Sequence, residues 1–179
     1  MSKPVVIISQ CLTGAVCRWD ALQLDACLYE TLQAHFTLIP FCPEMALCLG
    51  CPRPTIRLIR KSFNTEIPDN IELVQPQTGR ILTADMDALC ESFLSAHPAD
   101  GYVLKYKSPS CGLTNVKVYM GADSKEICGF ESGRFAAAVR RLYPNAPAID
   151  DFRLAQPGAI EEFVERTLKY KRQVNITLR

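Results

Sequence analysis

Short apolar runs recur along the chain, and between them apolar residues return at helical spacing. The runs over 4–9, 37–41 and 101–106 are continuous and rich in β-branched residues, which is typical of buried parallel strands. Helical spacing is found over 22–34 and again over 83–95. Strands that alternate with helices in this way predict an α/β fold, with a mainly parallel sheet flanked by helices as in a Rossmann-like domain.

The rest of the chain carries weaker patterns. Two apolar segments, 56–59 and 71–74, are expected to form strands in a hairpin-like excursion. Thr83 is expected to cap the helix that starts there. No repeat, linker or low-complexity segment interrupts the chain, so a single domain over 1–179 is expected. A further strand is expected over 116–120, and helices over 135–142 and 159–171.

Composition changes this picture little. Hydrophobic residues make up 48% of the 179 residues and charged residues 22%, as in an ordinary soluble globular protein. The formal net charge of +1 gives no argument for a strongly charged partner. Basic residues gather in 53–61 and 166–172, which we interpret as solvated faces, with a patch for nucleotide or RNA phosphates as the alternative.

The cysteine count matters more, because it depends on the compartment. The chain shows no signal-peptide pattern and no stretch near the roughly 20 apolar residues of a membrane span, so a cytoplasmic location is expected. Thiols stay reduced in the cytoplasm, and nine cysteines do not suit a disulfide framework. This density of reduced cysteine favours a metal or iron–sulfur site.

Cys11, Cys42 and Cys111 each lie just beyond the end of an expected strand. In an open parallel sheet, ligands bind beyond the carboxyl ends of the strands, so these three thiols are expected to converge. Three thiolates are one short of a closed tetrahedral site. A metal or cluster held by them would therefore keep an open position where chemistry can occur.

The other six cysteines give weaker signals. Cys48 and Cys51 form a CxxC motif, which is a moderate signal for zinc, iron–sulfur or thiol redox chemistry. Cys17 follows Cys11 in the same loop. We interpret Cys17, Cys48 and Cys51 as spare thiols near the site, and their being true ligands stays open. Buried or incidental positions are expected for the remaining three, which are Cys27, Cys90 and Cys128.

Polar residues beside the cysteines are candidates for proton transfer and binding. Glu44 is two residues from Cys42, and a carboxylate beside a metal-bound sulfur can move protons or orient a water. Ser108 and Ser110 flank the turn of Cys111. Their hydroxyls can cap that turn, or they can donate to a cluster sulfide or a substrate oxygen.

Five short motifs, taken in order, resemble the thiouracil desulfurase (DUF523) family. Cys42-Pro43-Glu44 alone would be a weak signal, whereas the three cysteine motifs in order are specific. The chain departs from the family pattern at Gln10, Trp19 and Ala21, where a small residue, tyrosine and glycine are usual. The motifs are Ser9-Gln10-Cys11-Leu12, Cys17-Arg18-Trp19-Asp20, Cys42-Pro43-Glu44, Pro52-Arg53-Pro54 and Leu104-Lys105-Tyr106-Lys107-Ser108-Pro109-Ser110-Cys111-Gly112, and Gly133-Arg134-Phe135-Ala136 and Asp151-Phe152-Arg153-Leu154 extend the resemblance.

The resemblance implies an α/β domain that holds a [4Fe–4S] cluster through three cysteines, with no protein ligand on the fourth iron. It further implies a non-redox desulfuration: the thiocarbonyl sulfur of a thiolated uracil binds that iron, water replaces sulfur at carbon, and sulfide leaves on the cluster. The implied ligands are Cys11, Cys42 and Cys111, and the positions that match the family near the site are Asp20, Glu44, Lys105 and Ser110.

The expected substrate is a thiolated pyrimidine base or nucleotide, with thiolated tRNA less favoured because no RNA-binding domain is evident. If 56–59 is a strand, Arg57 points away from its neighbours, and Arg53 and Arg57 would then hold a phosphate at the mouth of the pocket. That arrangement predicts a preference for a thiolated nucleotide over the bare base.

Two other hypotheses compete with a desulfurase. One is a zinc- or cluster-binding module without catalysis. The other is a thiol oxidoreductase built on Cys48 and Cys51, whose activity would survive the loss of Cys111.

Overall fold

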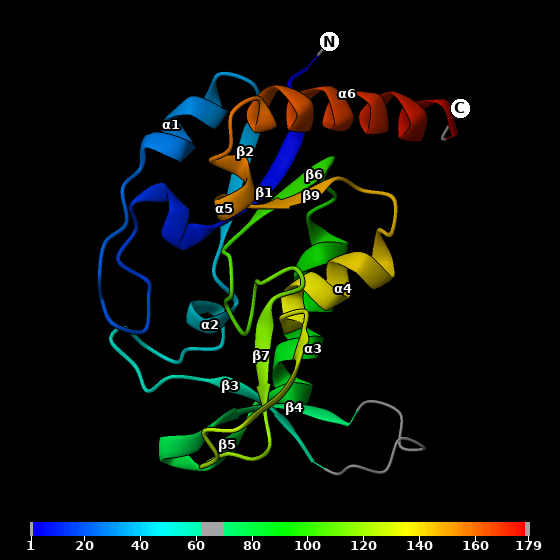
Figure 1. The fold of residues 1–179 in the computed structure, drawn as a ribbon. Coiled ribbons are helices and arrows are strands. Elements are labelled where there is room, and N and C mark those ends of the chain that lie inside the picture. The colour runs from blue at the N-terminus through cyan, green and yellow to red at the C-terminus, as the bar shows by residue number, and fades with distance from the viewer. Residues whose placement is uncertain (1, 62–69, 178–179) are drawn as a thin grey trace.

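A four-stranded parallel sheet forms one half of the protein (Figure 1). The structure is a computed structural model that describes residues 2–61 and 70–177. The strand order is β2-β1-β6-β9, and every pair is parallel. Because all four strands run the same way, their carboxyl ends meet at one edge. The strands are β1 (Val5–Ser9), β2 (Thr37–Phe41), β6 (Gly101–Leu104) and β9 (Ala148–Asp150).

Helices cover both faces of this sheet, which explains why its strands are continuously apolar. Val6 and Ile8 of β1 pack in one buried cluster with residues of α1 (Cys27–Gln33), α5 (Asp151–Leu154) and α6 (Ala159–Thr177). Ile7, between them, points to the other face and joins the cluster that contains residues of α3 (Thr83–Ala96) and α4 (Arg134–Leu142). Side chains alternate between faces along a strand, so a strand buried on both faces needs apolar residues at every position.

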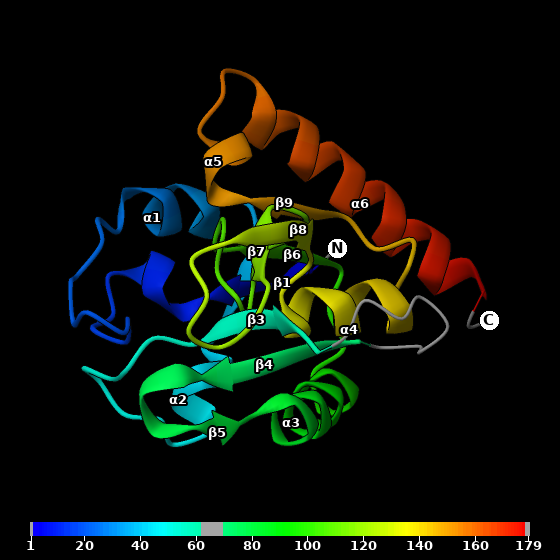
Figure 2. The same ribbon diagram turned by 60° about the horizontal axis from the view of Figure 1, so that its bottom comes forward.

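A second, mixed sheet lies at the other end of the protein, in the order β5-β4-β3-β7-β8. In Figure 2, β3, β4 and β5 lie side by side close to α3. Strand β3 is parallel to β7, and the other neighbours are antiparallel. The strands are β3 (Arg57–Arg60), β4 (Ile71–Gln75), β5 (Arg80–Ile81), β7 (Val116–Tyr119) and β8 (Ile127–Glu131), and the short helices are η1 (Gln10–Thr13), α2 (Pro43–Ala46) and η2 (Pro76–Thr78).

The expected fold class is confirmed, and the second sheet is larger than the expected hairpin. The two strands expected over 56–59 and 71–74 do pair antiparallel. The expectation for Thr83 was wrong: it is the first residue of α3, and its hydroxyl accepts a hydrogen bond from the Leu73 amide (2.9 Å) instead of capping the helix. No helix in the described residues combines the length and apolar character needed to cross a membrane.

Candidate active site

Three loops that follow β1, β2 and β6 meet at the carboxyl edge of the parallel sheet. Cys11 lies in η1, Cys42 immediately precedes α2, and Cys111 lies in the loop that follows β6. All three line one cavity of about 230 Å³. The parallel sheet therefore brings together three thiols that are far apart in the sequence.

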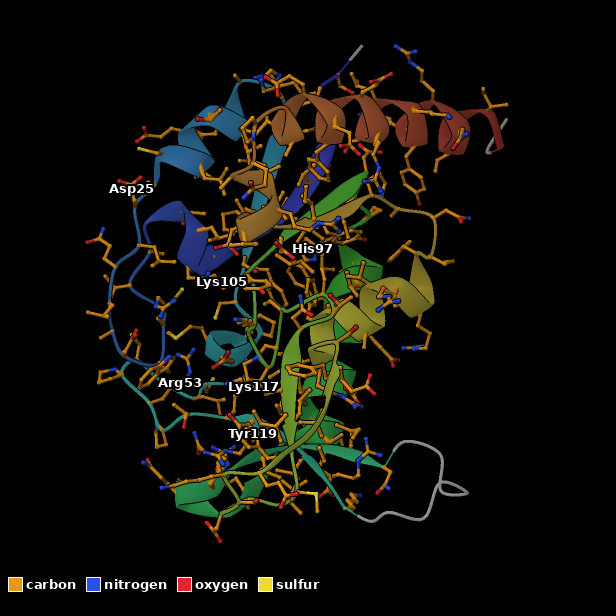
Figure 3. The ribbon with its side chains drawn as sticks, viewed as in Figure 1. Asp25, Arg53, His97, Lys105, Lys117 and Tyr119 are labelled. Atoms are coloured by element: carbon orange, nitrogen blue, oxygen red, sulfur yellow. The ribbon has the colours of Figure 1, made fainter. Side chains whose placement is uncertain are left out.

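Most of the other residues singled out from the sequence border the same cavity. Figure 3 labels two of them, Arg53 and Lys105, which come from different loops at this edge. The cavity is also lined by residues that the sequence analysis did not assign to a site, notably Arg18, Trp19 and Tyr106. The expected site residues that line it, besides the three cysteines, are Glu44, Arg53, Lys105 and Ser108.

The environments of the thiols differ. Burial raises the pKa of Cys11 to about 11, and the neighbouring Cys42 adds to that rise. Burial also raises the pKa of Cys111 well above its usual value, although a hydrogen bond with Ser9 opposes the rise. A hydrogen bond with the Cys17 thiol lowers the pKa of Cys42 to about 7 and raises that of Cys17. Cys42 is therefore the thiol of this group that ionises most readily.

Glu44 is held from two sides. Its Oε2 accepts a hydrogen bond from Nε of Arg53 at 2.8 Å, and its Oε1 accepts one from the hydroxyl of Ser110 at 2.9 Å. Arg53 is buried and also donates to the carbonyl oxygens of Cys17 and Gly50. The carboxylate of Glu44 thus has a fixed orientation at the cavity wall, while Ser110 is fully buried and contacts the site through Glu44.

Lys105 is oriented by Asp151, a residue that sequence reasoning did not assign to the site. Asp151 Oδ2 lies 2.6 Å from Nζ of Lys105, and its Oδ1 accepts a hydrogen bond from the amide of Tyr106 at 2.6 Å. Asp151 directly follows β9, a fourth strand of the same parallel sheet. Its position after a strand end is the signal that could have found it, but β9 spans only three residues and was not expected.

The Cys111 loop is held by its own serine and by the start of α4. The hydroxyl of Ser108 accepts from the amides of Ser110 and Cys111, both at 3.2 Å. The amide of Phe135 donates to the carbonyl of Ser110 at 2.8 Å. A Cβ on Gly133 would lie 2.6 Å from the backbone of Ser110, so only glycine allows this approach. The residues that precede and begin α4 therefore help to position the third thiol.

Arg57 does not reach the cavity, contrary to expectation. It does point opposite to Ile56, but Ile56 is the residue that lines the cavity. The guanidinium of Arg57 instead donates to the carbonyl of Ser124 at 3.0 Å and lies 4.5 Å from the ring centre of Tyr119. Of the two arginines expected to hold a phosphate, only Arg53 lines the cavity, and it is ion-paired with Glu44.

Asp20 also lies outside the cavity lining. Its carboxylate accepts two hydrogen bonds from Arg18, each at 3.1 Å, and one from the amide of Leu22. The hydrogen bonds with Arg18 lower the pKa of Asp20. Asp20 thus shapes its own loop, whereas Arg18 is the residue of the pair that faces the cavity.

Comparison with known proteins assigns the chain to a family. Residues 6–151 match the 2-thiouracil desulfurase family. The chain belongs to this family. It is also similar to the solved structure of the [4Fe-4S]-dependent thiouracil desulfidase TudS, with 26% sequence identity and a TM-score of 0.62 over 85% of this chain and 93% of that one. A comparison with curated proteins gives no match.

The Cys48–Cys51 motif lies outside the cavity lining. Cys48 is exposed and has a left-handed backbone (φ 57°). The thiol of Cys51 lies 3.1 Å from the carbonyl oxygen of Arg18. Cys17 differs from both, because it is buried and lines the cavity beside Cys42.

Proposed function

We propose that this protein is an iron–sulfur-dependent desulfurase that converts the thiocarbonyl of a thiolated uracil to a carbonyl without net redox change. The observation that carries the proposal is the meeting of Cys11, Cys42 and Cys111 with Glu44 in one cavity. It is supported by membership of the 2-thiouracil desulfurase family and by similarity to a [4Fe-4S]-dependent desulfidase. In the balanced reaction, thiouracil and water give uracil and hydrogen sulfide.

The donor set suits an iron–sulfur cluster. Iron–sulfur clusters are bound by cysteine thiolates, and the cavity offers cysteine sulfur as its main soft donor. Three thiolates around one zinc ion would stand about 3.8 Å apart, given tetrahedral bonds of about 2.3 Å. Within residues 2–61 and 70–177, no three histidine, cysteine, aspartate or glutamate side chains are grouped to hold one metal ion. Ligands of a cluster are spaced more widely, because each binds a different iron.

Cys11, Cys42 and Cys111 would hold the cluster, and Cys17 would remain beside it as a thiol. When bound, the cluster supplies an iron without a protein ligand, a soft Lewis acid that prefers the sulfur of a C=S group to the oxygen of a C=O group. Because of this preference, the site would bind the thiolated substrate more tightly than the uracil product.

Glu44 is the proposed proton acceptor. Water adds its oxygen to the thiocarbonyl carbon, one proton passes to Glu44, the carbon–sulfur bond then breaks, and the sulfur leaves with protons as hydrogen sulfide. Arg53 and Ser110 each occupy one carboxylate oxygen, so Glu44 is oriented before substrate enters. In this scheme Ser110 is a positioning residue, since it acts through Glu44.

Lys105 is the proposed hydrogen-bond donor to the polar atoms of the pyrimidine ring. An ammonium group has three donors, and the Asp151 carboxylate uses one of them. The others are available to an oxygen or ring nitrogen of the substrate in the cavity that Lys105 lines. Asp20, assigned to the site from the sequence, is left out of this scheme because it does not line the cavity.

The substrate we favour is a free base or a small nucleotide. A cavity of about 230 Å³ is smaller than the ~300 Å³ at which ligand pockets usually begin, so a cluster and one pyrimidine ring would fill it. A sugar or phosphate would then lie at the mouth, and thiolated tRNA remains the less favoured substrate. The nine cysteines are all free thiols, which supports a reducing cytoplasmic location.

The test is an anaerobic activity screen of the intact protein. We expect brown protein that releases sulfide and uracil in equal amounts from 2-thiouracil or 4-thiouracil, with thiolated uridine monophosphate and thiolated tRNA as further arms. Colourless, zinc-containing protein, or brown protein without sulfide release from any arm, would support a non-catalytic module. Disulfide reduction that survives Cys111→Ser would support a thiol oxidoreductase instead.

A further inference from the structure

A tight turn presents Trp19 at the edge of the cavity. The amide of Ala21 donates to the carbonyl of Arg18 at 3.1 Å, which closes a four-residue turn with Trp19 and Asp20 at its centre. Asp20 braces the turn through its two hydrogen bonds with the Arg18 side chain. The position of Trp19 is therefore set by its own loop before any ligand binds.

A second loop holds the same turn from the other side. The amide of Arg53 donates to the carbonyl of Trp19 at 2.9 Å, and the thiol of Cys51 lies against the carbonyl of Arg18. Arg53 is also ion-paired with Glu44, so this one residue contacts both the turn and the proposed proton acceptor. The backbone of Trp19 is thus positioned relative to the reacting centre.

The other two aromatic side chains of the cavity wall are already engaged. Phe41 is buried and stacked on Phe93, with ring centres 3.6 Å apart. Tyr106 is stacked on Phe152, with ring centres 5.0 Å apart, and Nζ of Lys107 lies 4.9 Å from the centre of the Tyr106 ring. Each of these rings is thus already stacked on another aromatic ring.

Trp19 is different. Its side chain is 48% exposed, and across the described residues no aromatic ring or cation packs on the indole. It borders the cavity and also a shallow hollow formed with Pro52 and Pro54. A large planar ring on a fixed backbone, open at the cavity edge, fits a planar ligand.

We propose that Trp19 is the platform on which the pyrimidine ring of the substrate stacks. This inference rests on the proposed function and adds a residue that determines affinity. Bases stack on aromatic side chains through their π-faces, and indole provides the largest face of any side chain. Stacking needs no hydrogen-bond code, so the platform accepts 2-thio and 4-thio isomers alike and leaves their discrimination to the polar groups of the cavity.

The kinetic test compares Trp19→Ala and Trp19→Phe with Phe130→Ala in the cluster-loaded protein. Phe130 is a matched control, since it is 59% exposed on β8 and does not line the cavity. We expect Trp19→Ala to raise KM for thiouracil about 10-fold, with a smaller change in kcat. Trp19→Phe should recover most of the affinity, and Phe130→Ala should match the wild type. A wild-type KM in Trp19→Ala would overturn the proposal.

A binding test uses the fact that Trp19 is the sole tryptophan of the chain. Titration of wild-type holoprotein with uracil should change the tryptophan emission in a saturable way, and the control Phe130→Ala should give the same curve. No change at uracil concentrations that inhibit turnover would overturn the proposal. If the wild type released no sulfide from any substrate, the proposed function would fail, while a saturable emission change would still support the platform. If the wild type were active and both readouts stayed unchanged, the platform alone would fail.

Discussion

The cavity cysteines and the Cys48–Cys51 pair show how this fold selects its thiols. Cys48 and Cys51 are within ten residues of Cys42, yet the cavity is lined by Cys11 and Cys111, which come from other strands of the sheet. Spacing in the sequence is therefore a poor guide to which thiols meet. The common edge of the parallel strands is the better guide, because it brings their carboxyl ends to one place.

Removing a cavity thiol is the strongest test of this contrast. We expect Cys11→Ser, Cys42→Ser and Cys111→Ser each to lose most cluster iron and nearly all activity after anaerobic reconstitution, because a three-thiolate site has no redundancy. Iron and acid-labile sulfide analysis, with the visible spectrum, would measure the loss. Cys27→Ser is the matched control, since Cys27 is exposed at the start of α1. Full iron retention in one of the three variants would remove that residue from the ligand set.

The next largest effect is expected at Glu44, whose replacement should lower turnover without loss of the cluster. Glu44→Gln keeps the shape of the side chain but cannot take a proton, so we expect turnover to fall roughly 100-fold while iron content is unchanged. Glu72→Gln is the matched control, because Glu72 is also ion-paired, through Lys61, but lies on β4 away from the cavity lining. Wild-type turnover in Glu44→Gln would move proton transfer to another group, with Lys105 the next to test.

Cys17 shares a feature with each group of cysteines: it lines the cavity, but it is not a proposed ligand. Its replacement therefore sharpens the comparison. Cys17 hydrogen-bonds to Cys42, as a proposed neighbour of the cluster. We expect Cys17→Ser to retain the cluster and to lower turnover by no more than several-fold, since a hydroxyl can replace the thiol as donor. Cluster loss in this variant would indicate four cysteine ligands and a closed site, in conflict with the proposed open iron.

The smallest effect is expected from the pair outside the cavity. Cys48→Ser combined with Cys51→Ser should keep the cluster and at least part of the activity, because neither thiol lines the cavity. Iron content and the rate of sulfide release would be compared with the wild type. A colourless double variant would show that the two groups of cysteines had been wrongly separated.

The sequence was most informative where strands are buried on both faces. The continuous apolar runs that end near Cys11, Cys42 and Cys111 predicted the parallel sheet and the shared edge, and the structure places all three thiols at one cavity. The strand preceding Asp151 was missed because β9 is only three residues long.

Side-chain direction was harder to predict. The alternation of side chains along a strand predicted that Arg57 and Ile56 point in opposite directions. The sequence does not say which of the two sides faces the cavity. The sequence marked Trp19 only as a departure from a family pattern, since its place at the cavity also depends on a loop more than thirty residues away that contacts its turn. Such long-range contacts leave no local pattern in the sequence.

The close fit of Gly133 against the Cys111 loop has a consequence for biosynthesis. A nascent chain that extends only to Gly112 already contains every proposed ligand, but it lacks the residues around Gly133 and Phe135 whose amides hold that loop. The loop that carries Cys111 cannot make these backbone hydrogen bonds at that stage. We therefore expect the cluster to be inserted only after α4 has been synthesised and has folded, late in the maturation of this protein.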